Sequence, residues 1–223
     1  TIETQVEIAK IVNEILFLKN HGDIRLVAFD LDNTTWNGVV GEDGIKKIKL
    51  DFYQKKSLLL IDNLIGKGTL FSIHSKNNEK IALQAIKKKL SFYKNVKTKT
   101  FKYINWESKL KSIKAVAKLV NFSRKNIIFL DDDMSNIKQV ENFLGEKNCF
   151  WVKNSYLFYI YVKIIYFINR NKKDNKKRYL DIKSNIKRES EKSSVGLLNY
   201  IKSSKLKITF SIKKINYERS IEL

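Results

Sequence analysis

The stretch that decides the fold is IRLVAFDLDNTTWNG, residues 24–38. It begins as a continuous apolar run, which is typical of a strand buried on both faces of a parallel sheet. The run ends in two carboxylates two residues apart, Asp30 and Asp32, and then in the hydroxyl of Thr34. Open α/β sheets bind ligands at the carboxyl ends of their strands, where this pair is expected to lie. One aspartate can act as a nucleophile, a second can move protons, and the pair can bind magnesium through oxygen.

Two later apolar runs also end in polar clusters. Residues 69–73 lead into His74 and Ser75, and residues 126–130 lead into three consecutive aspartates at 131–133. Helical patterns separate these runs, and strands that alternate with helices predict a parallel sheet covered on both faces. We therefore predict an α/β fold with a three-layer, Rossmann-like parallel sheet. The polar clusters should meet in one crevice at its edge.

The remaining elements fit this alternation. An amphipathic helix is expected at residues 4–19, before the first strand. Residues 36–50 carry three glycines amid Val-Val and Ile-Lys-Ile alternation, which predicts a short hairpin. Further helices are expected at 52–65, 78–90, 105–120 and 134–144, and further strands within 96–104 and at 149–152.

The character of the chain changes after residue 152. We predict an N-terminal helix at residues 1–22, a catalytic domain at 23–152 and a basic C-terminal α+β extension at 153–223. Because the chain opens with Thr1 in place of Met, we expect a fragment or a trimmed chain whose extension is incomplete. Within the extension we expect helices at 179–192 and 195–203 and a strand at 205–212.

These motifs resemble those of the haloacid dehalogenase (HAD) superfamily. FDLDNT at 29–34 matches the first motif, Ser75 the second, Lys109 the third and the aspartate pair at 131–132 the fourth. The similarity extends to the FkbH-like branch over TTWNGVVGEDG (34–44), SKNN (75–78) and NWESK (105–109). It runs from about residue 9 to residue 150. The short spacings between these motifs leave no room for a large lid, so the resemblance implies a HAD-like fold without a large cap, of subfamily III type.

The resemblance implies catalytic roles that suit the chemistry of these side chains. Asp30 would attack phosphorus to form an aspartyl phosphate, and Asp32 would protonate the leaving group and then activate water. Thr34 would brace the phosphate-binding loop, while Ser75 and Lys109 would hold the phosphoryl group and neutralise its charge. Two of these residues also admit a structural interpretation: Ser75 could cap the next helix, and Lys109 could be one of many solvated lysines.

The resemblance also implies a metal cofactor. Mg²⁺ would be held by Asp30, by the main-chain carbonyl of Asp32 and by Asp131, together with Asp132. The third aspartate of the later cluster, Asp133, is instead expected to cap the helix that begins at Met134.

Three functions remain open at this level. The resemblance to the FkbH-like branch implies loading of a glyceryl unit from a phosphorylated glycerate onto an acyl carrier protein, with dephosphorylation. An alternative is a capless phosphatase that acts on a small metabolite or a phosphoprotein. A third is a basic nucleic-acid-associated protein, although Lys-rich composition argues against base recognition, which favours Arg.

The composition narrows the class of protein. The formal charge is +21, carried by 38 lysines and only 6 arginines, and we attribute most of it to a lysine-rich background composition. A single cysteine, Cys149, excludes an internal disulfide and suits a reducing cytoplasm. The most apolar stretch, residues 156–168, is shorter than the ~20 residues needed to span a bilayer, so no membrane association is expected.

Three further residues receive structural interpretations. His74 should pack within the sheet, because neighbouring strand residues face opposite sides and Ser75 faces the crevice. Cys149 should be an inert core residue. Trp36 could shape the pocket or staple the predicted hairpin, and the sequence leaves both roles open.

Overall fold

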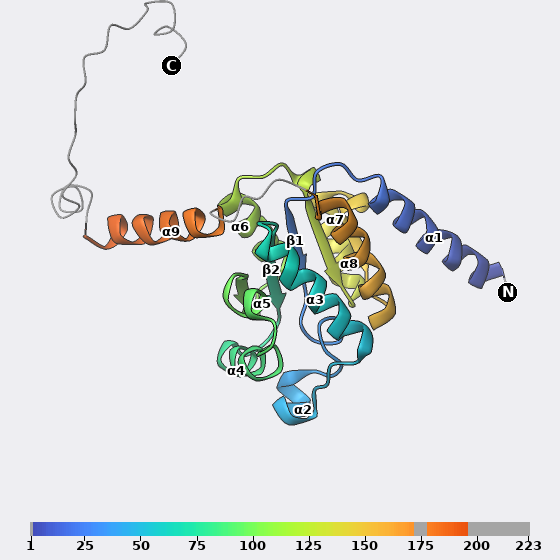
Figure 1. Ribbon diagram of the computed structural model, residues 1–223, viewed down its shortest axis with the longest axis horizontal. Helices are drawn as coiled ribbons and strands as arrows, with labels where there is room; N and C mark the ends of the chain where they lie inside the picture. Colours follow the sequence, from blue (N-terminus) through green and yellow to red (C-terminus); the bar gives the residue numbers. More distant parts are fainter. Residues whose placement is uncertain (1, 172–177, 196–223) are drawn as a thin grey trace, which may run out of the picture. The chain divides into compact units, whose positions relative to one another are not determined.

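A computed structural model describes residues 2–171 and 178–195 of the chain. Five parallel strands form one sheet in the order β3-β2-β1-β4-β5 (Figure 1). The predicted fold class is confirmed, because each neighbouring pair of strands is parallel and a helix lies between successive strands. The strands are β1 (Leu26–Phe29), β2 (Leu70–Ser75), β3 (Phe101–Ile104), β4 (Ile127–Asp131) and β5 (Cys149–Trp151).

The predicted helices are found close to their predicted bounds, and five of the described helices begin at a capping side chain. A short helix at Lys94–Thr98 was not predicted. The carboxylate of Asp51 accepts a hydrogen bond from the main-chain N–H of Gln54 at the start of α3, and Asn154 caps α8 in the same way. The helices are α1 (Ile2–Lys19), α2 (Val40–Lys47), α3 (Phe52–Gly66), α4 (Glu79–Lys89), α5 (Lys94–Thr98), α6 (Lys109–Val120), α7 (Met134–Leu144), α8 (Ser155–Asn169) and α9 (Arg178–Val195).

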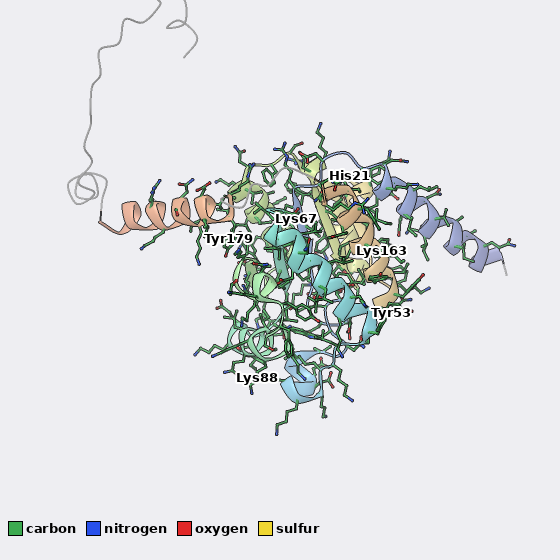
Figure 2. All side chains as sticks on the ribbon, viewed as in Figure 1. His21, Tyr53, Lys67, Lys88, Lys163 and Tyr179 are labelled. Atoms are coloured by element: carbon green, nitrogen blue, oxygen red, sulfur yellow. The ribbon has the colours of Figure 1, made fainter. Side chains whose placement is uncertain are left out.

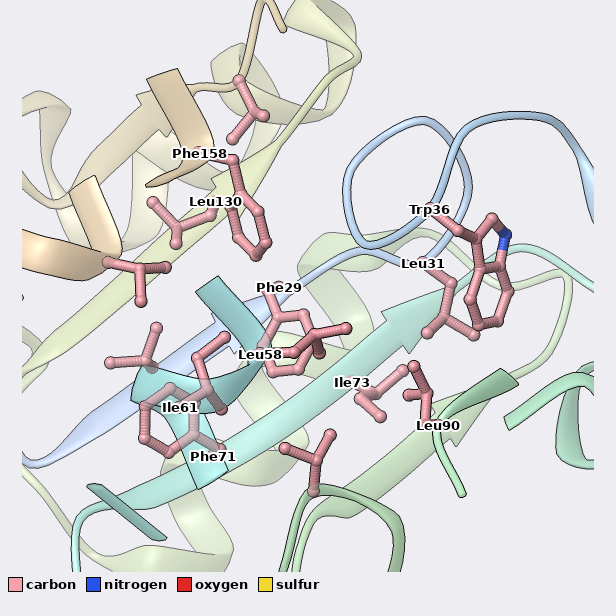
Figure 3. Close-up of a cluster of buried hydrophobic side chains, with 14 of the residues drawn as sticks. Phe29, Leu31, Trp36, Leu58, Ile61, Phe71, Ile73, Leu90, Leu130 and Phe158 are labelled. Carbon is pink, nitrogen blue, oxygen red and sulfur yellow. The ribbon is translucent and has the colours of Figure 1, made fainter. Parts of the chain in front are cut away.

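Each face of the sheet has its own apolar cluster. Along β1, Val27 and Phe29 face a cluster that contains residues of α3 and α8, whereas Leu26 and Ala28 face one that contains residues of α6 and α7. Figure 3 shows the first cluster, in which Phe29 lies among side chains from neighbouring strands and helices. Because all four β1 side chains are buried, the continuous apolar run of the sequence is explained.

The predicted hairpin at residues 36–50 is wrong. The segment instead forms α2, a short helix interrupted at Gly44, whose φ of 73° is in the left-handed region that favours glycine. Its ends still meet as the hairpin prediction required, since Asn37 and Lys49 exchange two main-chain hydrogen bonds of 2.8 and 3.1 Å. Within the described residues, α2 is the only helix between β1 and α3, which is consistent with a fold that lacks a large cap.

Helix α8 belongs to the core of the sheet. It begins three residues beyond the domain limit predicted at residue 152, and Phe158, Tyr161 and Ile165 are buried in the same cluster as β1. The predicted domain limits themselves stay predictions. The helix expected at 179–192 lies within α9, whereas the elements expected at 195–203 and 205–212 fall almost wholly outside the described residues.

The helices can also be compared with the length and hydropathy that a membrane-spanning helix requires. None of the helices among the described residues is both long and apolar enough to cross a membrane.

Candidate active site

The functional residues predicted from sequence converge on the carboxyl edge of the sheet. Asp30 follows β1 directly, Ser75 ends β2 and Asp131 ends β4. Lys109 is the first residue of α6, the helix that follows β3. Because these strands are parallel and adjacent, side chains from distant parts of the sequence meet at this edge.

Three carboxylates form a compact acidic cluster there. Oxygen atoms of Asp30, Asp131 and Asp132 all lie within 4.8 Å of one another. Asp30 and Asp131 are buried, and Asp132 is half-buried. The ammonium group of the buried Lys109 lies 2.9 Å from Asp30 Oδ1 and 2.5 Å from Asp131 Oδ2. Lys109 therefore offsets the repulsion between two carboxylates that water cannot screen.

Burial and mutual repulsion change the protonation equilibria of this cluster. Desolvation raises the pKa of Asp30 well above its usual value, Lys109 lowers it in part, and the charge of Asp131 raises it again. Burial and the charge of Asp131 also raise the pKa of Asp132. Burial would lower the pKa of Lys109, but the two carboxylates beside it outweigh that effect and raise it. Lys109 is consequently charged at neutral pH.

The cluster fits a divalent cation. Its donors are carboxylate oxygens, which are the ligands that Mg²⁺ and Ca²⁺ prefer. Asp30 Oδ1 is buried and, among the described residues, forms an ion pair but accepts no hydrogen bond of normal geometry. A buried carboxylate oxygen without a hydrogen bond is costly, and coordination of a cation would satisfy it.

Asp32 is not one of the three carboxylates of this acidic cluster, and its own carboxylate accepts three hydrogen bonds. Its Oδ1 accepts from Trp36 Nε1 at 2.7 Å and from the main-chain N–H of Val40 at 3.1 Å. Its Oδ2 accepts from Asn77 Nδ2 at 2.7 Å. The carboxylate of Asp32 is thus fixed in orientation, as a group that transfers protons must be. That its main-chain carbonyl binds metal stays a prediction.

The hydroxyl residues of the same loop connect the two acidic segments. Thr34 Oγ1 donates to Asp132 Oδ1 at 3.2 Å, and Thr35 Oγ1 donates to the main-chain oxygen of Asp30 at 2.6 Å. Asn77 Nδ2 also donates to Ser75 Oγ at 2.9 Å. The loop after β1 is therefore tied to the ends of β2 and β4.

Comparisons with solved structures connect this arrangement to known proteins. The N-terminal part of the protein BF1531 from Bacteroides fragilis, which contains a phosphatase domain and is complexed with Mg, is 22% identical with a TM-score of 0.54. The match covers 73% of this chain and 44% of that one. A HAD superfamily (subfamily III A) hydrolase from Legionella pneumophila is 12% identical with a TM-score of 0.50, over 83% of this chain and 100% of that one.

The chain has a HAD-like fold. No protein-family model matches the sequence, and no curated protein matches it either. At these identities the solved structures establish the fold, while the FkbH-like branch rests on the sequence motifs alone. The chain spans less than half the length of the Bacteroides fragilis chain that it matches.

Three residues at this edge of the sheet were not assigned from sequence. Asn77 orients Asp32, as described above. Asn136 Nδ2 donates to Asp131 Oδ1 at 3.1 Å, and Lys76 Nζ donates to Asn136 Oδ1 at 3.0 Å. Asn77 and Lys76 lie in the SKNN stretch, so their proximity to Ser75 was the available signal. Asn136 lies one turn into α7 and carried no such signal, because a helical asparagine is usually solvated.

The structural interpretations of three other residues are confirmed. Asp133 accepts a hydrogen bond from the main-chain N–H of Ser135 and caps α7. Cys149 is buried, and burial raises the pKa of its thiol. His74 is buried within the sheet. Trp36 is fully buried, and its indole N–H binds Asp32, so it contributes to the site as well as to the core.

His74 connects β2 to α6 through Ser112, and it also contacts Ser72 of its own strand. Its Nε2 lies 2.9 Å from Ser72 Oγ and its Nδ1 lies 2.8 Å from Ser112 Oγ. Ser112 Oγ donates to the main-chain oxygen of Lys109 at 2.9 Å, so it must accept from Nδ1–H of the imidazole. Burial, together with the charge of Lys109, lowers the pKa of His74 to about 3. A neutral imidazole with its proton on Nδ1 therefore ties the strand of Ser75 to the first turn of the Lys109 helix.

Proposed function

We propose that this HAD-like chain is a magnesium-dependent enzyme of phosphoryl transfer that uses Asp30 as its nucleophile. The observation that carries the proposal is the cluster of Asp30, Asp131 and Asp132, in which Lys109 bridges the buried carboxylates of Asp30 and Asp131. The carboxylate of Asp32 is fixed in orientation in the same loop. A merely structural role is a poor explanation, because packing two carboxylates and an ammonium out of water is seldom stabilising. Buried titratable groups that strongly perturb one another are typical of active sites.

The proposed reaction assigns one step to each side chain. A carboxylate oxygen of Asp30 forms a bond to phosphorus while the bond from phosphorus to the leaving oxygen breaks. Asp32 supplies the proton that the leaving oxygen needs, and then takes a proton from the water that attacks the aspartyl phosphate. Hydrolysis releases inorganic phosphate and restores both carboxyl groups.

The surrounding residues would stabilise the charge of the transferring group. Lys109 and the hydroxyl of Ser75 would bind phosphoryl oxygens, and Thr34 would keep the loop after β1 in place. Bound Mg²⁺, held by Asp30, Asp131 and Asp132 with the carbonyl of Asp32, would neutralise phosphate charge at the acidic cluster. The magnesium complex of the Bacteroides fragilis protein supports this choice of ion.

The finer proposal is glyceryl loading of the FkbH type. The motifs TTWNGVVGEDG, SKNN and NWESK support it, as does a site without a large cap, which leaves access for a protein-bound substrate. The acyl group would come from a phosphorylated glycerate and its acceptor would be an acyl carrier protein, whose acidic surface would suit a basic chain. Hydrolysis of a small phosphorylated metabolite is the second candidate, and its support is the acidic cluster itself.

The test compares two chemically identical substitutions. Release of inorganic phosphate from a panel of phosphomonoesters is measured with Mg²⁺ for the wild-type chain, for Asp30→Asn and for Asp133→Asn. Asp30→Asn should lose at least ~1000-fold in rate, whereas Asp133→Asn should retain activity because asparagine caps helices as well as aspartate does. Turnover that survives in Asp30→Asn would refute the assignment of the nucleophile.

A second measurement separates the two candidate reactions. The wild-type chain is incubated with a phosphorylated glycerate and an acyl carrier protein, and intact-protein mass spectrometry records the mass of the carrier. A gain of one glyceryl unit that requires Asp30 supports loading. Phosphate release without a mass change of the carrier supports simple hydrolysis.

A further inference from the structure

The opposite edge of the sheet holds a second concentration of charge. Four of the six arginines of the chain surround the amino ends of the strands: Arg25 precedes β1, Arg124 precedes β4, Arg170 follows α8 and Arg178 opens α9. In a sequence with 38 lysines, arginine is the exception. Its gathering at one edge indicates that the guanidinium group, and not charge alone, matters there.

A cavity of about 210 Å³ opens among these residues. We name it the amino-edge cavity, and three cationic side chains line it: Arg25, Lys67 and Arg178. One carboxylate, Asp23, also lines the cavity and forms an ion pair with Arg25. The cavity therefore keeps an excess of positive charge. Lys67 lies at the end of α3 that is remote from α2 and the catalytic edge (Figure 2).

Phe122 positions the two arginines of this cavity. The guanidinium carbon of Arg178 lies 4.3 Å from the centroid of the Phe122 ring, and that of Arg25 lies 5.6 Å from it. Stacking uses the flat face of a guanidinium, whereas its N–H groups point outward in its plane and can still donate. Lys67 is positioned separately, since its Nζ donates to the main-chain oxygen of Arg170 at 3.1 Å. The guanidinium groups of Arg25 and Arg178 and the ammonium group of Lys67 are thus held around the amino-edge cavity.

We propose that the amino-edge cavity binds a small phosphate-class anion. Arginine forks match the oxygens of phosphate groups in pairs, and the ammonium of Lys67 adds a point charge. The cavity is smaller than the ~300–1,000 Å³ typical of pockets for drug-sized molecules, so it suits a group of the size of diphosphate. A folded nucleic acid would require an extended surface instead of a cavity of this volume.

This site is separate from the proposed catalytic site. Arg25 and Asp30 stand at opposite ends of β1, five residues apart, which corresponds to ~16 Å along a strand. None of the residues that line the amino-edge cavity belongs to the acidic cluster or its hydrogen-bond partners. The proposal therefore does not depend on the function assigned to the carboxyl edge.

Calorimetric titration with sodium diphosphate tests the proposal. The full chain is titrated in EDTA at constant ionic strength, so that no metal can hold the anion at the acidic cluster. We expect saturable binding that Arg178→Lys and Lys67→Met each weaken by at least about fivefold, because one removes a fork and the other a charge. Arg188→Lys, the same change on α9 outside the cavity, should leave the affinity unchanged. Melting temperatures report whether each variant is folded.

Any of four outcomes would overturn the proposal. One is the absence of saturable binding in the wild-type chain. The second is an affinity that Ser75→Ala weakens while Arg178→Lys and Lys67→Met do not, which would place the anion at the catalytic edge. The third is an affinity that Arg188→Lys weakens as much as Arg178→Lys, and the fourth is tighter binding of a single-stranded oligonucleotide at the same salt; either would indicate a general polyanion surface.

Discussion

Lys109 lies between two buried carboxylates, and this position gives it a structural role as well as the proposed catalytic one. In Lys109→Met the side chain keeps similar bulk, but Asp30 and Asp131 are left without a countercharge. We expect the free energy of unfolding in EDTA to fall by about 3–5 kcal/mol, since removal of one partner leaves a buried charge uncompensated. Urea denaturation measures this change.

Magnesium provides the control for this prediction. Because a bound cation replaces the missing positive charge, Mg²⁺ should stabilise Lys109→Met more than it stabilises the wild-type chain. Lys111→Met removes an exposed lysine from its ion pair with Glu107 and should change little. If Mg²⁺ stabilised Lys109→Met and the wild-type chain equally, placement of the cation beside Lys109 would be contradicted.

His74 gives the chain a pH-dependent term in its stability. The pKa of His74 is about 3 in the folded chain, below its usual value near 6.5 in the unfolded chain. Between these values the unfolded state binds one proton more, so stability should fall as the pH falls, by up to ~1.4 kcal/mol per unit. Burial of Asp30 acts in the opposite direction, because its raised pKa favours proton binding to the folded state.

Comparison of His74→Gln with the wild-type chain isolates the histidine contribution. The difference between their free energies of unfolding should change with pH between about 6.5 and 3, while His21→Gln serves as the matched control. Nitrogen NMR of the wild-type chain should show His74 as a neutral imidazole protonated on Nδ1 at pH 5. An imidazolium at that pH would contradict the lowered pKa of His74.

At the scale of elements, the start of α3 supports the loop after β1. Asp51 caps the helix, and Gln54 Oε1 accepts a hydrogen bond from the main-chain N–H of Asp51 at 3.0 Å. The amide of the buried Gln54 also donates to Asn37 Oδ1 at 2.9 Å, in the segment that follows Thr34. The helix and the loop therefore share one network.

Asp51→Ala should consequently weaken both helix α3 and the loop after β1. We expect a loss of about 1 kcal/mol in the free energy of unfolding, typical of a lost N-cap, and a severalfold lower rate of phosphate release. Asp51→Asn retains a capping oxygen and should stay close to the wild-type chain in both measurements. A rate that is unchanged in Asp51→Ala would show that the loop after β1 does not rely on α3.

The same scale shows what the sequence could predict. Buried parallel strands can be recognised in the sequence as apolar runs. The polar residues that end these runs predict which side chains meet, because ligands bind at the carboxyl ends of the strands in any open α/β sheet. The segment 36–50 misled because its glycines and short alternation fit a hairpin and a broken helix equally well, and tertiary contacts decide between them. The SKNN stretch places Asn77 near Ser75, but the hydrogen bonds of Asn77 and Asn136 could not be predicted, because they depend on distances across the site to Asp32 and Asp131.

At the scale of the whole molecule, the charge of +21 has two explanations that one experiment separates. If the positive field guides anionic substrates to the site, kcat/KM should fall by about tenfold between 0.02 and 0.5 M NaCl, because screening acts on the encounter. kcat should change little, since the bound substrate lies beside fixed groups. Phosphomonoesters with more negative charges should lose more. If kcat/KM is independent of salt for all of them, the lysines reflect background composition and take no part in catalysis.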